Sequence, residues 1–106
     1  MKLTKKLKTA ILKHAESAYP KESCGLLILN GNYIPCTNQS TLDSQFAISP
    51  QDYVAASEQG EIVAIVHSHP DSSSQASSVD KAQMALHGLP LVIVGYPQGD
   101  FAIHKP

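Results

Sequence analysis

The sequence predicts an α/β fold in which one mixed β-sheet is flanked by helices. Short apolar runs rich in β-branched residues, typical of buried strands, alternate with stretches whose apolar residues recur at every third or fourth position, typical of amphipathic helices. The chain has 106 residues and a mass of 11.4 kDa, which suffices for one hydrophobic core. We therefore expect a single domain over residues 1–106.

The first third of the chain predicts a helix followed by a β-hairpin. We expect the helix over residues 3–19, ended by Pro20, because residues at spacings of three and four form one stripe. A strand over 24–29, a tight-turn signal at 30–32 and a return strand over 33–36 predict the hairpin. The stripe consists of Leu3, Leu7, Ala10, Ile11, His14 and Ala18.

The middle of the chain is more polar and predicts a loop before the second helix. Residues 37–44 are expected to form the loop, and residues 45–48 a short strand. Ser49 is a preferred N-cap and Pro50 is suited to the first helical position. These two residues predict a helix that continues to about Gln59.

The second half predicts a strand, a helix and two further strands. An apolar run over 61–66 is typical of a buried strand, and a serine-rich segment that we expect to be mobile follows it. Ser77 is the expected cap of a helix that ends at His87, before Gly88 and Pro90. The last two strands are expected over 91–95 and 101–104, where they complete the sheet.

Composition excludes several classes of partner and compartment. The formal net charge is −1 with 16% charged residues, so we expect binding neither to nucleic acid nor to a membrane. No signal-peptide pattern occurs, and no apolar run approaches the roughly 20 residues of a membrane span. The two cysteines, Cys24 and Cys36, form no Cys-X-X-Cys motif, which favours a reducing cytoplasm. The lysines near the start are interpreted as a solvated helix face: Lys2, Lys5, Lys6, Lys8 and Lys13.

A histidine pair at the end of a predicted strand is the strongest functional signal. In His67-Ser68-His69-Pro70 the histidines are two positions apart, so both imidazoles project from one face of the strand. Asp80 falls in the first turn of the next helix and is expected to face back toward the strand end. Two imidazole nitrogens, one carboxylate oxygen and a fourth position open to water are the ligand set of a catalytic zinc site.

Both parts of this pattern also have structural interpretations. A His-X-His sequence arises by chance in many proteins, and Ser77-Ser78-Val79-Asp80 fits a capping box. Ser77 can serve as N-cap and in catalysis through different atoms. A carboxylate bound to zinc is poorly placed to close a capping box as well, so for Asp80 we expect the metal to prevail.

Together with Glu22 upstream, this spacing resembles the JAMM motif of MPN (JAB1/MPN/Mov34) metalloproteases, which is Glu, then His-Ser/Thr-His, seven residues and Ser-X-X-Asp. The resemblance implies an MPN-type domain with cytidine-deaminase-like layering that hydrolyses a peptide or isopeptide bond. It implies one Zn²⁺ per chain, bound by His67, His69 and Asp80. It further implies that Glu22 is the general base and that Ser77 donates a hydrogen bond to the developing oxyanion.

Two other segments, 48–53 and 58–64, resemble the N-terminal domain of the tail assembly proteins of lambda-like phages. This resemblance implies a role in tail assembly in the cytoplasm of a bacterial host. The substrate implied is a protein or peptide: a tail protein by the phage resemblance, or a ubiquitin-like protein by the JAMM resemblance. Those phage chains usually continue into a cysteine-peptidase-like domain, so this chain either works alone or is part of a longer protein.

Alternative functions remain open on the sequence. Some MPN domains bind partners without catalysis, so a non-catalytic scaffold in tail assembly is the main alternative. Cys24, two residues after Glu22, would face the same side of its strand and could support a thiol mechanism with a histidine. His87 lies seven residues after Asp80, on roughly the same helix face, and could contact a metal ligand without binding the metal itself.

Overall fold

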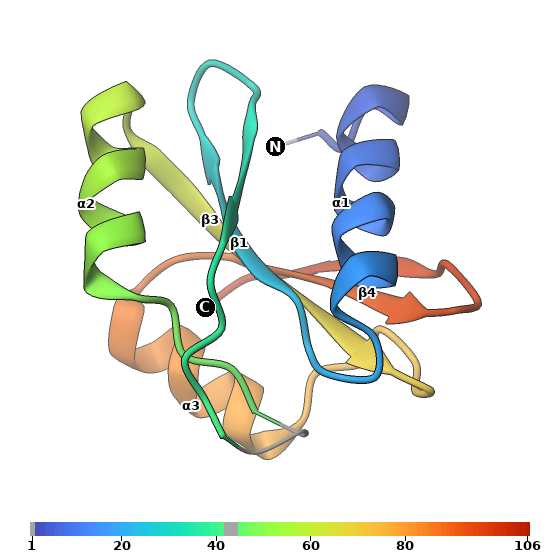
Figure 1. Ribbon diagram of the computed structural model, residues 1–106. Coiled ribbons are helices and arrows are strands. Elements are labelled where there is room, and N and C mark those ends of the chain that lie inside the picture. Colours follow the sequence, from blue (N-terminus) through green and yellow to red (C-terminus); the bar gives the residue numbers. More distant parts are fainter. Residues whose placement is uncertain (1, 42–44) are drawn as a thin grey trace.

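The computed structural model describes residues 2–41 and 45–106. Over these residues the chain forms three helices and five strands, which confirms the predicted α/β class (Figure 1). The helices are α1 (Lys5–Ala18), α2 (Pro50–Gln59) and α3 (Ser78–His87). The strands are β1 (Cys24–Ile28), β2 (Tyr33–Cys36), β3 (Ile62–Pro70), β4 (Leu91–Tyr96) and β5 (Phe101–His104).

The strands form one mixed sheet in the order β2-β1-β3-β4-β5. β3 and β4 run parallel, and the other neighbouring pairs are antiparallel. The parallel pair requires a crossover, and α3 provides it. β1 and β2 form the predicted hairpin, whose turn contains Gly31 at a φ of 91°, a conformation that favours glycine.

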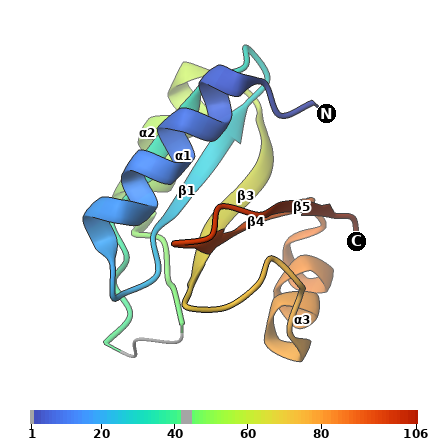
Figure 2. The same ribbon diagram turned by 90° about the vertical axis from the view of Figure 1, so that its right-hand side faces the viewer.

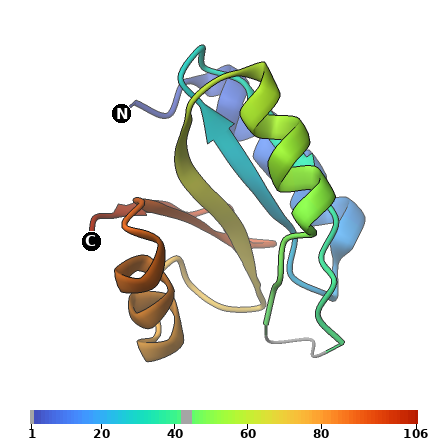
Figure 3. The same cartoon turned by 90° about the vertical axis from the view of Figure 1, so that its left-hand side faces the viewer.

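Helices cover both faces of the sheet. α1 buries Leu7, Ile11 and Ala15 against one face. α2 and α3 contribute Ala56 and Met84 to a second core on the opposite face. Figures 2 and 3 view the molecule from these two sides and show β1 between α1 and α2.

The alternation of side chains along the strands decides which residues enter which core. On β4, Val92 and Val94 face α1, whereas Leu91 and Ile93 face the side of α2 and α3. Cys24, Leu26 and Ile65 belong to the same side as Leu91 and Ile93. Every second residue of β1 and β3 therefore points to the face covered by α2 and α3, and this alternation positions the candidate site.

The segment before α2 differs from the expectation. Residues 45–48, all of them described, form no strand; Ile48 makes only an isolated bridge to Asn38. The Asn38 side chain satisfies backbone groups there, because Nδ2 donates to Gln45 O at 3.1 Å and Oδ1 accepts from Ala47 N at 3.0 Å. A side chain thus partly takes the place of a strand partner, beside one backbone hydrogen bond from Gln39 N to Ala47 O. The loop expected over 37–44 lies partly outside the described residues.

The N-caps of the helices follow the expectations closely. The hydroxyl of Ser49 accepts a hydrogen bond from Asp52 N at 3.0 Å, and Pro50 occupies the first position of α2.

In the part of the chain that the structure describes, none of the helices has the length and apolar composition needed to cross a membrane.

Candidate metal centre

The two histidines at the end of β3 project from the sheet face that carries α3. His67 is 1% exposed and follows Ile65 on that face, and His69 lies two residues further on. Ser68 points to the opposite face, where its hydroxyl accepts a hydrogen bond from Ser23 N at 2.8 Å. The strand period therefore brings both imidazoles together, as predicted.

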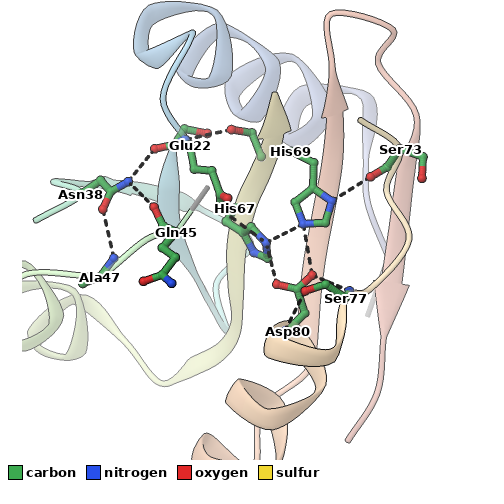
Figure 4. Close-up of polar contacts among 11 residues, drawn as sticks. Glu22, Asn38, Gln45, Ala47, His67, His69, Ser73, Ser77 and Asp80 are labelled. Atoms are coloured by element: carbon green, nitrogen blue, oxygen red, sulfur yellow. Dashed lines mark hydrogen bonds and ion pairs between the residues drawn. The ribbon is translucent and has the colours of Figure 1, made fainter. Parts of the chain in front are cut away.

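His67, His69 and Asp80 converge on one point at the end of the strand (Figure 4). The two Nε2 atoms lie 3.0 Å apart. Asp80 Oδ1 lies 3.1 Å from His67 Nε2, and Asp80 Oδ2 lies 3.1 Å from His69 Nε2. The first turn of α3 carries Asp80 back to the strand end, as the sequence predicts.

The orientation of His69 is set by the backbone. Its Nδ1 lies 2.8 Å from the carbonyl oxygen of Ser73, which can only accept a hydrogen bond. Nδ1 therefore carries the proton, and in the neutral ring the lone pair of Nε2 points at Asp80 and His67. This is the tautomer that a histidine needs to bind a metal through Nε2.

His67 is fixed by packing. Its ring stacks on Phe46 with a centroid distance of 4.5 Å and an interplanar angle of 23°. Burial lowers the pKa of His67, although the hydrogen bond and charge of Asp80 oppose this shift. A neutral imidazole, the form that binds metal, is therefore favoured.

Asp80 closes a capping box and also faces both histidines, although we expected its carboxylate to be poorly placed for the two together. Oδ2 accepts from Ser77 N at 2.8 Å, and Asp80 N donates to Ser77 Oγ at 3.1 Å. A carboxylate has two oxygens with two lone pairs each, so Oδ1 remains directed at His67. Burial raises the pKa of Asp80, but the hydrogen bonds from His67 and Ser77 outweigh it and hold the pKa below its usual range.

The donor set fits a zinc ion. The two imidazole Nε2 atoms lie 3.0 Å apart, and each lies 3.1 Å from one oxygen of Asp80, Oδ1 for His67 and Oδ2 for His69. In a tetrahedral zinc site with metal–nitrogen and metal–oxygen bonds of about 2.0 Å, ligand atoms lie roughly 3.3 Å apart. A divalent cation at this point would replace the proton that His67 Nε2 shares with Asp80 and would bind both imidazoles and the carboxylate.

A buried carboxylate stands beside this cluster. Glu22 precedes β1, is 6% exposed and places Oε1 at 3.8 Å from His67 Nε2. Burial, and after it the charge of Asp80, raises the pKa of Glu22 to about 7. Its backbone is held by Asn38, whose Nδ2 donates to Glu22 O at 3.0 Å. A carboxyl group with a pKa near neutrality can both accept and release a proton.

An open cleft of about 600 Å³ gives access to the cluster, and its lining includes Glu22, His69, Ser77 and Asp80. Ser77 is exposed. Its hydroxyl uses a lone pair to accept from Asp80 N, so the hydroxyl proton can still be donated toward the cleft. The structure thus brings together all five residues predicted for the site.

Cys24 and His87, which the sequence also suggested, do not belong to this cluster. Cys24 Sγ donates weakly to Cys36 O at 4.0 Å, and burial raises the pKa of this thiol to about 12. The thiolate required for nucleophilic attack is therefore scarce at neutral pH. His87 is exposed and lines a different hollow, between α2 and α3.

The serine-rich loop contributes more than the sequence suggested. Ser74 is buried, and the loop makes hydrogen bonds to Gln98, Asp100 and His104. Our expectation of a mobile segment does not fit this bonding. The role of the Ser73 carbonyl was missed, because a backbone acceptor leaves no signal in the sequence.

Comparison with known proteins extends this description. Residues 4–103 match the family model described as prokaryotic homologs of the JAB domain. Tail tip assembly protein K of Escherichia phage N15 is 45% identical over 101 residues, which cover 92% of this chain and 42% of that protein. The chain thus spans less than half the length of this relative.

Solved structures share the fold. Protein DSY2949 from Desulfitobacterium hafniense superposes with a TM-score of 0.78 at 26% identity, covering 94% of this chain and 78% of that one. AF2198, a JAB1/MPN domain protein from Archaeoglobus fulgidus, gives a TM-score of 0.60 at 24% identity, covering 93% and 80%. The predicted MPN-type architecture is confirmed.

Proposed function

The chain belongs to the family of prokaryotic homologs of the JAB domain, and on this premise we propose that it is a zinc-dependent hydrolase of peptide or isopeptide bonds. In this proposal His67, His69 and Asp80 hold one Zn²⁺. The observation that carries the proposal is the convergence of three ligand atoms beside a buried carboxylate in an open cleft. The fourth position of such a site would be open to water.

The side chains of the site have separate tasks in this chemistry. Bound zinc would lower the pKa of a water and polarise the scissile carbonyl. Glu22 Oε1 accepts the proton of the attacking water and later gives it to the leaving amine. The pKa of Glu22, raised by burial to about 7, suits both transfers. The Ser77 hydroxyl donates a hydrogen bond to the carbonyl oxygen as its negative charge grows.

Zinc content and cleavage together test this function. Protein purified without chelator is analysed by plasma mass spectrometry, and cleavage is followed on a panel of peptides and isopeptide-linked conjugates. We expect one zinc per chain in the wild type and none in His69→Ala, with cleavage only in the zinc-bound form. His87→Ala is the matched control, because that histidine is exposed and outside the cluster. A wild type that binds no zinc even when zinc is supplied would refute the proposal.

A second candidate function is a non-catalytic scaffold in tail assembly. It is favoured by the 45% identity to a protein named for tail tip assembly. In this case the chain would act through protein partners in the cytoplasm of a bacterial host. A phage chimera tests this alternative. In it, the matching segment of protein K in phage N15 is exchanged for this chain, either as wild type or as Glu22→Gln. Plaques from both chimeras favour the scaffold, and plaques from the wild-type chimera alone favour hydrolysis.

A further inference from the structure

We propose that Asp100, in the turn between β4 and β5, is a positioning residue of the metal centre that acts on His69 through one peptide group of the serine-rich loop. This inference rests on the proposed zinc site. It assigns a role to a carboxylate that does not belong to the motif in β3 and α3.

The peptide group between Ser73 and Ser74 connects the two side chains. Its carbonyl oxygen, on Ser73, lies 2.8 Å from His69 Nδ1. Its N–H, on Ser74, donates to Asp100 Oδ2 at 2.7 Å. The peptide group is planar and rigid, so a carboxylate that fixes the N–H also fixes the direction of the carbonyl.

This chain of hydrogen bonds affects the ligand electronically as well. A carboxylate on the N–H polarises the peptide group and makes its carbonyl a stronger acceptor, because hydrogen bonds in series reinforce one another. A stronger acceptor on Nδ1–H increases the basicity of Nε2, the atom directed at the metal position. Asp100 therefore supports His69 as a carboxylate bonded directly to a metal-binding histidine would, with one peptide group in between.

The surroundings of Asp100 hold this arrangement in place. Ser74 is 8% exposed, and its carbonyl lies 2.8 Å from His104 Nε2. The Ser72 carbonyl, two residues earlier, accepts from Gln98 Nε2 at 2.7 Å. Side chains of the β4–β5 turn and of β5 thus bind three successive peptide groups of the loop.

Gly95 lies on β4 opposite His69, and its lack of a side chain leaves space for the Ser72 carbonyl and the Asp100 carboxylate. A Cβ atom at this position would overlap both the Ser72 carbonyl and the Asp100 carboxylate. The hydrogen bond from Ser74 N also keeps the pKa of Asp100 below its usual range, so the carboxylate is charged at neutral pH. The glycine on β4 therefore allows the serine-rich loop and the β4–β5 turn to approach each other closely.

The test compares zinc affinity in Asp100→Ala and in a control, Asp52→Ala. Asp52 also accepts from a backbone N–H, Thr37 N at 2.6 Å, but it lies on α2, away from the histidines. Zinc affinity is measured by competition with a chromophoric chelator. We expect Asp100→Ala to bind zinc about 10- to 100-fold more weakly, the size of effect seen for outer partners of metal ligands, and Asp52→Ala to bind within about twofold of wild type.

Nitrogen-15 NMR of the imidazoles provides a readout independent of affinity and activity. In the apo wild type we expect His69 as the Nδ1–H tautomer, and in Asp100→Ala a mixture of both tautomers. If Asp100→Ala fails to fold by circular dichroism, Asp100→Asn decides. The asparagine oxygen accepts from Ser74 N without the charge, so affinity should fall by at least about threefold.

The outcomes separate this inference from the proposed function. A wild type without zinc affinity refutes both. Zinc affinity in the wild type together with unchanged affinity in the folded Asp100 variant refutes only the positioning role. A loss of affinity as large in Asp52→Ala as in Asp100→Ala also refutes it, because the effect would then be general destabilisation.

Discussion

Cys24 and His67 are direct partners in the antiparallel pair of β1 and β3. Glu22 lies two residues before Cys24, so the alternation of side chains turns its carboxylate to the face that carries His67 and His69. A register shift of one residue would turn Glu22 toward α1 instead. The pairing of two strands far apart in the sequence thus completes a candidate site whose proposed metal ligands come from one short segment.

Glu22→Gln is expected to abolish hydrolysis and to keep zinc. An amide cannot accept the proton of the attacking water, and losing a general base lowers kcat/KM by about 10²- to 10⁴-fold. Cleavage is measured on the substrate that the wild type cleaves, and zinc by plasma mass spectrometry. Glu58→Gln, an exposed position on α2, is the control. Undiminished cleavage in Glu22→Gln would rule out the assigned base.

Ser77→Ala and Asp80→Ala should separate helix capping from metal binding. Ser77→Ala removes the cap and should lower the free energy of unfolding by about 1 kcal/mol while zinc remains bound. Asp80→Ala removes both the capping partner and a ligand, so zinc should be lost. Urea unfolding with a chelator measures the first effect, and zinc content the second. Zinc lost in Ser77→Ala would show instead that the cap is required to hold Asp80.

Zinc should raise the thermal stability of the wild type. A ligand that binds only the folded state at 100 times its Kd stabilises it by about 2.7 kcal/mol. We expect an increase in Tm on zinc addition, reversed by a chelator, in the wild type and in His87→Ala. His69→Ala should not respond. An equal response in His69→Ala would place the zinc elsewhere.

The thiol of Cys24 should remain unreactive in the folded protein. Burial raises its pKa to about 12, so the thiolate is rare at pH 8. Because the pKa is higher in the folded state, this group contributes stability that is present below pH 9 and is lost as the pH rises toward 12. Iodoacetamide labelling at pH 8 should be slow in buffer and fast in urea. Cys24→Ser should retain cleavage, and its inactivation would support a thiol mechanism.

Much of the fold was predictable because each element carries its own local signal. The β1–β2 hairpin follows from a turn sequence between two short apolar runs, and α2 follows from Ser49 and Pro50. No strand forms over the described residues 45–48: the Asn38 side chain bonds Gln45 O and Ala47 N, and the backbone pairing that the structure describes there is a Gln39 N–Ala47 O bond and one isolated bridge. Such a substitution of a side chain for a strand depends on tertiary contacts.

The candidate site, too, has features that could be predicted from the sequence and features that could not. The period of a strand and the first turn of a helix suffice to predict that His67, His69 and Asp80 converge. The resemblance to a known motif was needed to connect Glu22 with them, because strand pairing cannot be read from one sequence. The Ser73 carbonyl and Asp100 were not predictable, because they act through the backbone and across a turn.

Under the proposed function, the distribution of the site along the chain would make metal retention and turnover separable. His67, His69 and Asp80 all lie in the unit formed by β3 and α3, whereas Glu22 is supplied from the far side of a long-range strand pairing. Under the proposed function, a chain that loses only the Glu22 carboxylate would keep a metal-stabilised domain with its binding surfaces intact. Under the proposed function, an inactive, metal-loaded form of this chain would therefore be a single substitution away from an active one.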